Sequence, residues 1–353
     1  MGYRPSLDGL RAIAVLAVMC WHFVLPGVKG GFLGVDIFFV LSGFLITKLL
    51  VEEWDLTGGI HLGRFYLRRM LRLFPALFLL LLVTLPFVPR NWTLQALFYV
   101  SNWGFLTKQL GLSAIMQLWS LSVEEQFYFI WPPMLLGLLA LRTPRAAIYA
   151  VVALLAAASA VFKIVAWHSF DDWNRFYFGT DGRADELLIG CGLGLFLTWS
   201  RIPGKAWFRR TVKLATIPAV LWLGYLMVEA AVYWRFFYQQ GGITLVALAT
   251  SVLILQCLIA PIHWIRAILA SRPLVGIGRM SYGLYLWHSP VGWLTDPRNF
   301  EWVPILPRAV LFIVRVCLTF AVAGLSYQFL ERPMLRLKHR FSQAGQRLPE
   351  SGA

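Results

Sequence analysis

Ten long apolar segments follow one another along this chain, and they restrict it to a membrane protein built from helices. They cover residues 10–28, 31–50, 71–88, 118–141, 146–167, 184–199, 212–233, 243–265, 277–294 and 303–330. A helix needs about 20 apolar residues to cross the hydrocarbon of a bilayer, and most segments reach that length. Only 14% of the 353 residues are charged, whereas 59% are apolar, which is too much apolar surface for a soluble domain. We expect an all-α integral membrane protein with about ten transmembrane helices.

Basic residues between these segments predict the orientation of the chain. With the N-terminus in the cytoplasm, 22 of the 32 lysines and arginines fall on the inner side. Both termini are then cytoplasmic. Because the net charge of +15 is explained by these short connections, we expect no nucleic-acid partner.

The chain is expected to form one domain. Residues 1–340 form the transmembrane domain, and residues 341–353 are expected to be a disordered tail. The first apolar run continues without a small-residue cleavage pattern, so we expect it to be retained as a span rather than cleaved as a signal. The four cysteines lie in apolar segments without CxxC spacing, which predicts small core residues and no metal site. A shorter apolar stretch, residues 94–106, predicts an interfacial helix.

Arg11 and His22 lie eleven residues apart in the first apolar segment. On a helix this spacing places both side chains within roughly 20° of one face and about 16 Å apart along the axis. Ionisable groups inside a span are costly and often mark a functional path. Alternatively, Arg11 is an anchor at the inner end of the span and His22 a polar packing residue. Neutral His22 has the chemistry of a general base for a hydroxyl group.

Four arginines follow the second apolar segment in the stretch RFYLRRMLRLFP, which we expect to be an inner loop. The preference for positive charge on the inner side explains much of this cluster. Guanidinium groups also bind phosphate oxygens in pairs, so the same residues predict an anion site beside Arg11. The members of the cluster are Arg64, Arg68, Arg69 and Arg72.

Two adjacent carboxylates, Glu124 and Glu125, stand near the outer end of the fourth apolar segment. They either cap a helix N-terminus after Ser120 or Ser122, or take part in the chemistry. In the second interpretation Glu124 orients His22 or stabilises its charged form.

Two further ionisable residues lie inside apolar segments. Asp36 follows a glycine-rich stretch at the start of the second segment, and the glycines around it (Gly30, Gly31, Gly34 and Gly43) predict close helix packing. His288, in the sequence SYGLYLWH, is either a second proton carrier or a packing residue.

Taken together, these segments resemble the acyltransferase-3 family of bacterial integral-membrane acyltransferases. The matching stretches are YRPSLDGLRAIAVLAVMCWHF, GGFLGVDIFFVLSGFLIT, RFYLRRMLRLFPAL, LWSLSVEEQFY, GRMSYGLYLWH and LERP, in this order up to Pro333. The resemblance implies an Arg-x10-His signature at Arg11 and His22, an Arg-x-x-Arg pair at Arg69 and Arg72, and a Val-Glu motif at Glu124.

Members of this family transfer an acyl group, usually acetyl, from cytoplasmic acyl-CoA to an acceptor at the outer face. By resemblance we expect an acyl-CoA-dependent O-acyltransferase of the bacterial inner membrane, with acyl-CoA as donor, a carbohydrate acceptor and no permanently bound cofactor. Some members carry a second, esterase-like domain, and we expect that function to be supplied elsewhere or not needed.

Within this framework each candidate residue has an expected role. His22, Glu124 and Asp36 are the catalytic candidates, while Arg11, Arg68, Arg69 and Arg72 bind the phosphates of acyl-CoA. Substrate contacts are expected from Glu125, His288 and two aromatic residues of the acidic outer loop, Trp173 and Tyr177, which can stack on a sugar. An acyl-histidine intermediate is an open alternative to direct transfer.

A proton-coupled transporter or exporter is the competing function, because intramembrane His, Asp and Glu residues also form proton relays. Internal repeats, which are common in transporters, are not apparent in the sequence. A purely structural or anchoring role gives no reason for so many ionisable groups in spans. The acceptor and the oligomeric state are not determined by the sequence.

Overall fold

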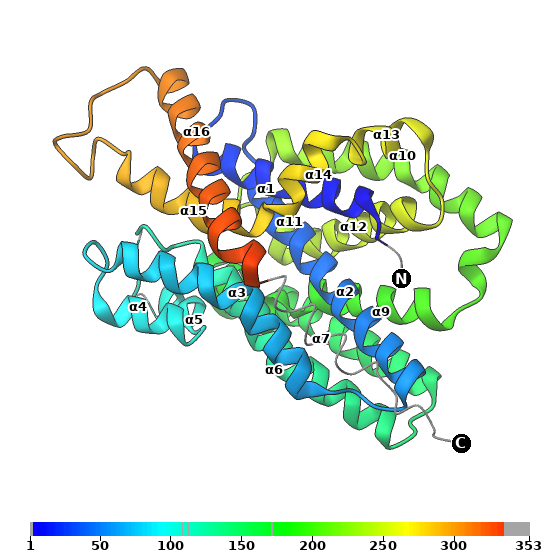
Figure 1. Cartoon of the computed structure of the whole chain (residues 1–353). Helices are drawn as coiled ribbons and strands as arrows, with labels where there is room; N and C mark the ends of the chain where they lie inside the picture. Colours follow the sequence, from blue (N-terminus) through cyan, green and yellow to red (C-terminus); the bar gives the residue numbers. More distant parts are fainter. Residues whose placement is uncertain (1–2, 108, 112, 171, 335–353) are drawn as a thin grey trace, which may run out of the picture.

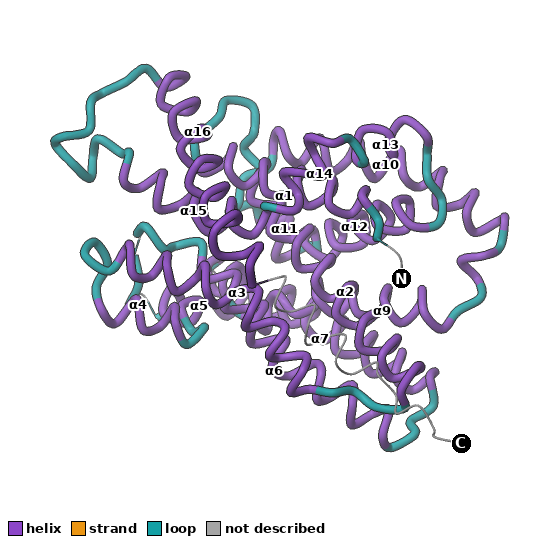
Figure 2. The backbone as a smooth tube through the Cα atoms, in the orientation of Figure 1, coloured by secondary structure: helices purple, strands orange, loops and turns teal. Residues whose placement is uncertain are grey.

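The computed structural model describes residues 3–107, 109–111, 113–170 and 172–334. Over these ranges the chain forms helices joined by loops and contains no β-strand (Figure 1; Figure 2). The prediction of an all-helical fold is confirmed. The expected tail, residues 341–353, lies outside the described residues.

Long helices form the body of the protein, and short ones connect them. The long helices are α1 (Pro5–His22), α2 (Gly34–Thr57), α3 (Leu62–Thr84), α6 (Leu118–Ala140), α7 (Arg145–Phe170), α9 (Thr180–Trp199), α10 (Ala206–Glu229), α12 (Gly242–Leu258), α15 (Ser281–Leu294) and α16 (Arg308–Ser326). The short ones are α4 (Arg90–Leu97), α5 (Ser101–Leu106), α8 (Trp173–Phe178), α11 (Arg235–Gln239), α13 (His263–Leu269) and α14 (Arg272–Arg279). A π-helical turn, Tyr327–Glu331, continues α16.

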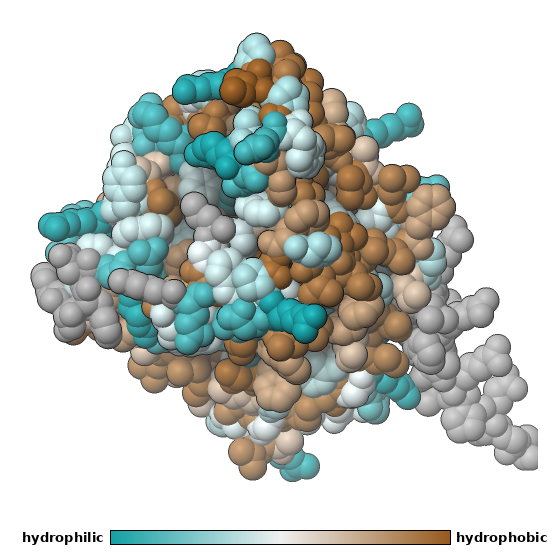
Figure 3. Space-filling model, turned by 90° about the vertical axis from the view of Figure 1, so that its left-hand side faces the viewer, coloured by the Kyte–Doolittle hydropathy of each residue, from teal (hydrophilic) through white to brown (hydrophobic). Residues whose placement is uncertain are grey.

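Among the described residues, four helical stretches are long and apolar enough to cross a bilayer on their own: Gly31–Thr57, Arg145–Trp167, Ala206–Glu229 and Arg308–Met334. In the first, 72% of the most apolar window is buried inside the protein, against 22–28% in the other three. The helix α2 therefore lies at the centre, while α7, α10 and α16 turn apolar side chains outwards. Figure 3 shows broad hydrophobic areas on the face of the molecule that it presents. The chain is a multi-pass membrane protein.

The remaining predicted spans carry charged groups or bends. The number of ten transmembrane helices and the cytoplasmic location of both termini therefore stay predictions. Four predicted elements differ from the structure. The arginine stretch was expected in a loop, but α3 begins at Leu62 and carries it as helix. The segment 243–265 is bent by 96° between α12 and α13, and 277–294 is broken at Met280 between α14 and α15. The expected outer loop before residue 184 is largely helical, because α7 ends at Phe170 and α9 begins at Thr180.

Glycines allow α2 to lie against its neighbours at very short range. A Cβ atom added at Gly43 would collide with the backbone carbonyl of Leu187 in α9, and one at Gly34 would collide with the carbonyl of Ala14 in α1. From the other side, Gly190 of α9 meets the backbone of α2 at Val40. The prediction that these glycines serve helix packing is confirmed.

Candidate active site

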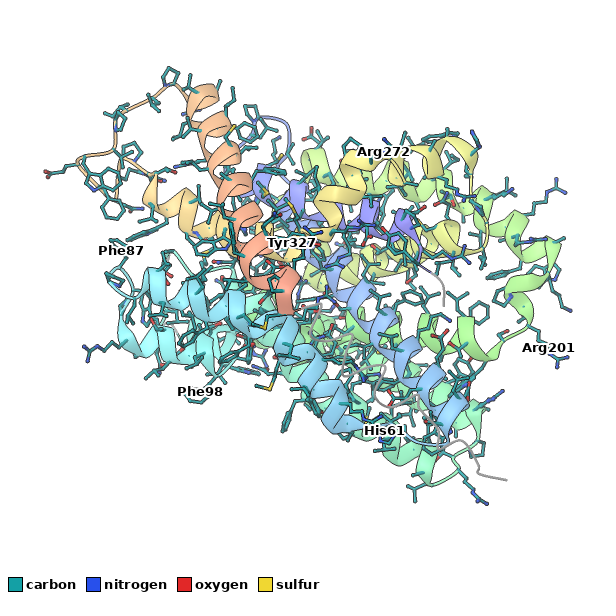
Figure 4. All side chains as sticks on the ribbon, viewed as in Figure 1. His61, Phe87, Phe98, Arg201, Arg272 and Tyr327 are labelled. Carbon is teal, nitrogen blue, oxygen red and sulfur yellow. The ribbon has the colours of Figure 1, made fainter. Side chains whose placement is uncertain are left out.

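A cavity of about 790 Å³ lies between α1, α2, α3, α6 and α15. Its lining on α2 runs from Val35 to Thr57. At 1.5 Å per residue this is about 33 Å, comparable to the thickness of a bilayer's hydrocarbon core. The exposed side chains of Leu56 and His61 mark its mouth, where α2 connects to α3. Figure 4 shows His61 beside the start of α3 and Phe87 beyond its other end.

Five guanidinium groups line this cavity, from Arg11, Arg64, Arg68, Arg69 and Arg72. The four on α3 follow one another at intervals of four, one and three residues, so at 100° per residue they project over less than half of the helix circumference. The carboxylates in the lining are those of Glu53 and Glu124, so the cavity wall has an excess of three positive charges. An arrangement of this kind binds multiply charged anions such as phosphates.

The arginines differ in how firmly they are held. The guanidinium of Arg69 donates to Glu125 from Nε at 2.8 Å and from Nη2 at 2.6 Å, and lies 3.3 Å from the ring centre of Tyr128. Arg68 is 3.6 Å from Glu53. Arg11, Arg64 and Arg72 form no salt bridge with any described residue. These three are free to pair with a ligand.

Glu124 lies in the cavity wall, on the seventh residue of α6. Its carboxylate accepts hydrogen bonds from Ser42 and Tyr128 and lies 3.8 Å from Arg69. Helix α6 begins at Leu118, and no acidic residue stands in its first turn. The capping interpretation of Glu124 and Glu125 is therefore wrong. Among the described contacts of Glu124 there is none to His22.

The two intramembrane histidines meet each other. The rings of His22, the last residue of α1, and His288 on α15 are 4.7 Å apart between centroids, in an edge-to-face arrangement. Both Nδ1 atoms contact a backbone carbonyl, that of Val18 at 3.0 Å and that of Tyr285 at 2.6 Å. A carbonyl only accepts, so each Nδ1 carries the hydrogen and each Nε2 keeps its lone pair. The Nε2 of His288 is buried and has no hydrogen-bond partner within the described ranges.

Tyr285 connects the histidines to the cavity. Its side chain lines the cavity, and its ring centre is 5.3 Å from that of His288. Its hydroxyl group contacts that of Ser120 on α6. Tyr285, Ser120 and Tyr128 could not be predicted as site residues, because single hydroxyl residues carry no spacing signal. Tyr285 does share the matched stretch GRMSYGLYLWH with His288, and this proximity in the sequence is the signal that points to it.

Asp36 lies outside the cavity lining, in a buried cluster of charges. Its carboxylate is 3.3 Å from Arg183 of α9, and Arg183 is 3.0 Å from Glu186. In the same helix Asp185 is paired with Lys163 of α7 at 2.7 Å. These side chains are essentially inaccessible. The pairing ties α2, α7 and α9 together, and the sequence analysis missed both cationic partners.

The two aromatic candidates of α8 are differently accessible. Tyr177 is buried, with Trp119 packed on it at 4.6 Å and the guanidinium of Arg183 at 5.3 Å. Trp173 is partly exposed and has its ring centre 5.6 Å from that of Tyr177. Of this pair, Trp173 has the surface needed to stack on a sugar.

Known proteins resemble the chain over almost its whole length. The relative named "Putative peptidoglycan O-acetyltransferase YrhL" of Bacillus subtilis (strain 168) is 37% identical over 94% of this chain and 55% of its own length. The peptidoglycan O-acetyltransferase OatA of Listeria monocytogenes is 37% identical over 94% of this chain and 56% of its own length. The chain thus spans just over half the length of these relatives. No solved structure matches it.

A family model gives the same assignment. The acyltransferase-3 model, described as an acyltransferase domain, matches residues 4–327. The match includes every helix that lines the cavity, and both histidines. The chain belongs to the acyltransferase-3 family, as its motifs indicate.

Proposed function

We propose that this protein is an O-acetyltransferase that moves acetyl from cytoplasmic acetyl-CoA to a hydroxyl group of a glycan at the outer face of the bacterial inner membrane. The observation that carries the proposal is the arginine-lined cavity, which runs along α2 and reaches Tyr285 beside the His22–His288 pair. Because two relatives bear the name of peptidoglycan O-acetyltransferases, a peptidoglycan-type glycan is the acceptor class we propose.

The donor enters from the mouth between α2 and α3. Its phosphates pair with Arg11, Arg64 and Arg72, which form no salt bridge within the described part of the chain, and with the more loosely held Arg68. Arg69 is held beside Glu124 and Glu125, and it adds its positive charge to the cavity wall that binds the donor. The cavity volume of about 790 Å³ falls within the range of ligand sites, and its length suits an extended thioester arm.

His22 acts as the general base. Its Nδ1–H group donates to Val18, so the lone pair of Nε2 is available to take a proton. The acceptor hydroxyl gives its proton to Nε2, and its oxygen attacks the thioester carbonyl carbon. The carbon–sulfur bond then breaks, and the leaving thiolate takes the proton from the imidazolium. The products are the acetyl ester and free CoA.

The other candidates support this step in different ways. The orphaned Nε2 of His288 accepts a hydrogen bond from the acceptor. Glu124 and Glu125 hold Arg69 in the cavity wall. Asp36 fixes α2 against α9 through Arg183 and does not touch the reacting groups.

The test is acetyl transfer by the purified full chain in nanodiscs, with release of CoA thiol and acetylation of soluble peptidoglycan strands both measured. We expect His22→Ala to abolish transfer, while His263→Ala, on α13 outside the cavity lining, leaves it unchanged. Full turnover by His22→Ala contradicts the base role. Movement of a solute without thiol release would favour a transporter instead.

A further inference from the structure

Two hydroxyl groups meet on the cavity wall, and they come from helices far apart in the sequence. The hydroxyl of Ser120 on α6 lies 2.5 Å from that of Tyr285 on α15. Both also contact the backbone carbonyl of Gln117 at 3.2 Å. The ring centre of Tyr285 lies 6.2 Å from that of Phe38 and 5.3 Å from that of His288. This pair therefore lies where the cavity approaches the histidines.

The hydrogen of Tyr285 can be released without breaking the contact between the two hydroxyl groups. Two hydroxyl hydrogens serve three contacts: Ser120 to Tyr285, Ser120 to Gln117 and Tyr285 to Gln117. Because the two oxygens lie 2.5 Å apart, one hydrogen lies between them, and Ser120 can supply it by donating to Tyr285. The hydrogen of Tyr285 then points at the Gln117 carbonyl or at a bound molecule. Gln117 is the N-cap residue of α6, and its carbonyl accepts the first bond of that helix, so it keeps a partner when Tyr285 turns away.

Most other hydroxyl groups on the cavity wall lack this freedom. Ser42 and Tyr128 both donate to Glu124, and Tyr282 donates to the carbonyl of Leu73 at 2.7 Å. Thr57 donates to backbone carbonyls at the mouth. Ser281 has no hydrogen-bond partner among the described residues, but it precedes Tyr285 by one helical turn, about 6 Å farther from His288 along the axis.

Attack on a thioester places negative charge on the carbonyl oxygen, and acyl-transfer enzymes stabilise it with preorganised donors. We propose that Tyr285 is this donor, a catalytic residue whose O–H group binds the oxyanion while Ser120 donates to the Tyr285 oxygen. The assignment rests on the proposed acetyl transfer. The proton of Tyr285 stays on its oxygen throughout the step, and the substrate proton travels through His22.

The experiment is steady-state acetyl transfer by the full chain in nanodiscs, with acetyl-CoA and soluble peptidoglycan strands. We expect Tyr285→Phe to lower kcat by roughly 10²–10³-fold, with the KM for acetyl-CoA changed less than about threefold. Ser120→Ala should lower kcat by roughly tenfold, because the Tyr285 oxygen then loses the hydrogen bond that positions its O–H group and strengthens it as a donor. Tyr238→Phe is the matched control, since it also removes a buried tyrosine hydroxyl that bonds to a backbone carbonyl, that of Val232 at 2.7 Å.

The outcomes separate the two claims. If the unmodified chain releases no CoA, the proposed function fails and the role of Tyr285 fails with it. If that chain is active and Tyr285→Phe keeps its kcat, or changes only KM, the oxyanion role alone is overturned. Should Tyr285→Phe fail to fold, 3-fluorotyrosine at position 285 keeps the shape and makes the hydroxyl a stronger donor. An unchanged kcat in that variant would also overturn the proposal.

Discussion

Arg69 of α3 directs two of its nitrogens, Nε at 2.8 Å and Nη2 at 2.6 Å, at a single carboxylate oxygen of Glu125 on α6. The guanidinium also covers the ring of Tyr128 at 3.3 Å. The side chains of Arg69 and Glu125 are both less than one-fifth exposed. Arg69 therefore joins two walls of the cavity, in addition to any contact it makes with a donor.

This ion pair predicts a strong coupling between the two positions. We expect Arg69→Ala and Glu125→Ala each to destabilise the protein, and the double variant to lose less than the sum of the two. The coupling free energy should be about 1.5–3 kcal/mol, as for hydrogen bonds between charged groups. Unfolding of the four proteins in the same detergent measures it. Additive losses would contradict the importance of the contact.

Arg72 allows donor binding to be tested with less effect on folding, because it has no salt bridge to a described residue. We expect Arg72→Ala to weaken the binding of acetyl-CoA roughly tenfold with little change in unfolding temperature. Calorimetric titration of the purified chain measures this Kd. Arg201→Ala, an exposed arginine outside the cavity, is the control (Figure 4). Equal affinities for the two variants would return Arg72 to a purely topological role.

Arg183 is predicted to be indispensable for folding. Replacing it by Met leaves Asp36 and Glu186 buried without their cation, which costs about 3–5 kcal/mol. The control Arg279→Met changes an exposed arginine that contacts Tyr3, and it should stay within about 0.5 kcal/mol of the parent. Thermal unfolding in detergent compares the two. Similar stability for both variants would show that the buried charges are neutralised in another way.

Alanine substitutions at two glycines are predicted to change the stability of the protein in opposite directions, because the two positions are packed differently. In α9, Gly190→Ala forces a methyl group against the carbonyl of Val40, and overpacking of this kind costs about 1–3 kcal/mol. In α6, a Cβ at Gly137 meets nothing within 4 Å, so Gly137→Ala should gain up to about 1 kcal/mol from helix propensity. Unfolding temperatures measure both changes. Destabilisation by Gly137→Ala would contradict the open space at that position.

The local parts of this architecture could be predicted from the sequence. Apolar runs located the helices, and α6 begins at Leu118 as expected because the run begins there. The start of α3 could not be found this way. Its arginines are too polar for a lipid-facing span, but they face a cavity inside the protein, and hydropathy does not distinguish the two environments.

Contacts between distant residues account for the other omissions. Asp36 and Arg183 are 147 residues apart, and Ser120 and Tyr285 are 165 apart, so no periodicity relates either pair. The predicted link between Arg11 and His22 rests on the geometry of one helix, whereas the neighbours of His22 in the structure include α15, which carries both Tyr285 and His288. A one-dimensional pattern cannot show which helix lies beside which.

The excess of positive charge on the cavity wall also affects the protein when no donor is present. Like charges that share a poorly hydrated space repel one another, which raises the free energy of the folded state. Any polyanion that settles among Arg11, Arg64 and Arg72 relieves this repulsion, and linkage converts its affinity into resistance to heat. The unliganded form is then the least robust form of the molecule, and nucleotide fragments without an acyl group should protect it as well as the complete donor does.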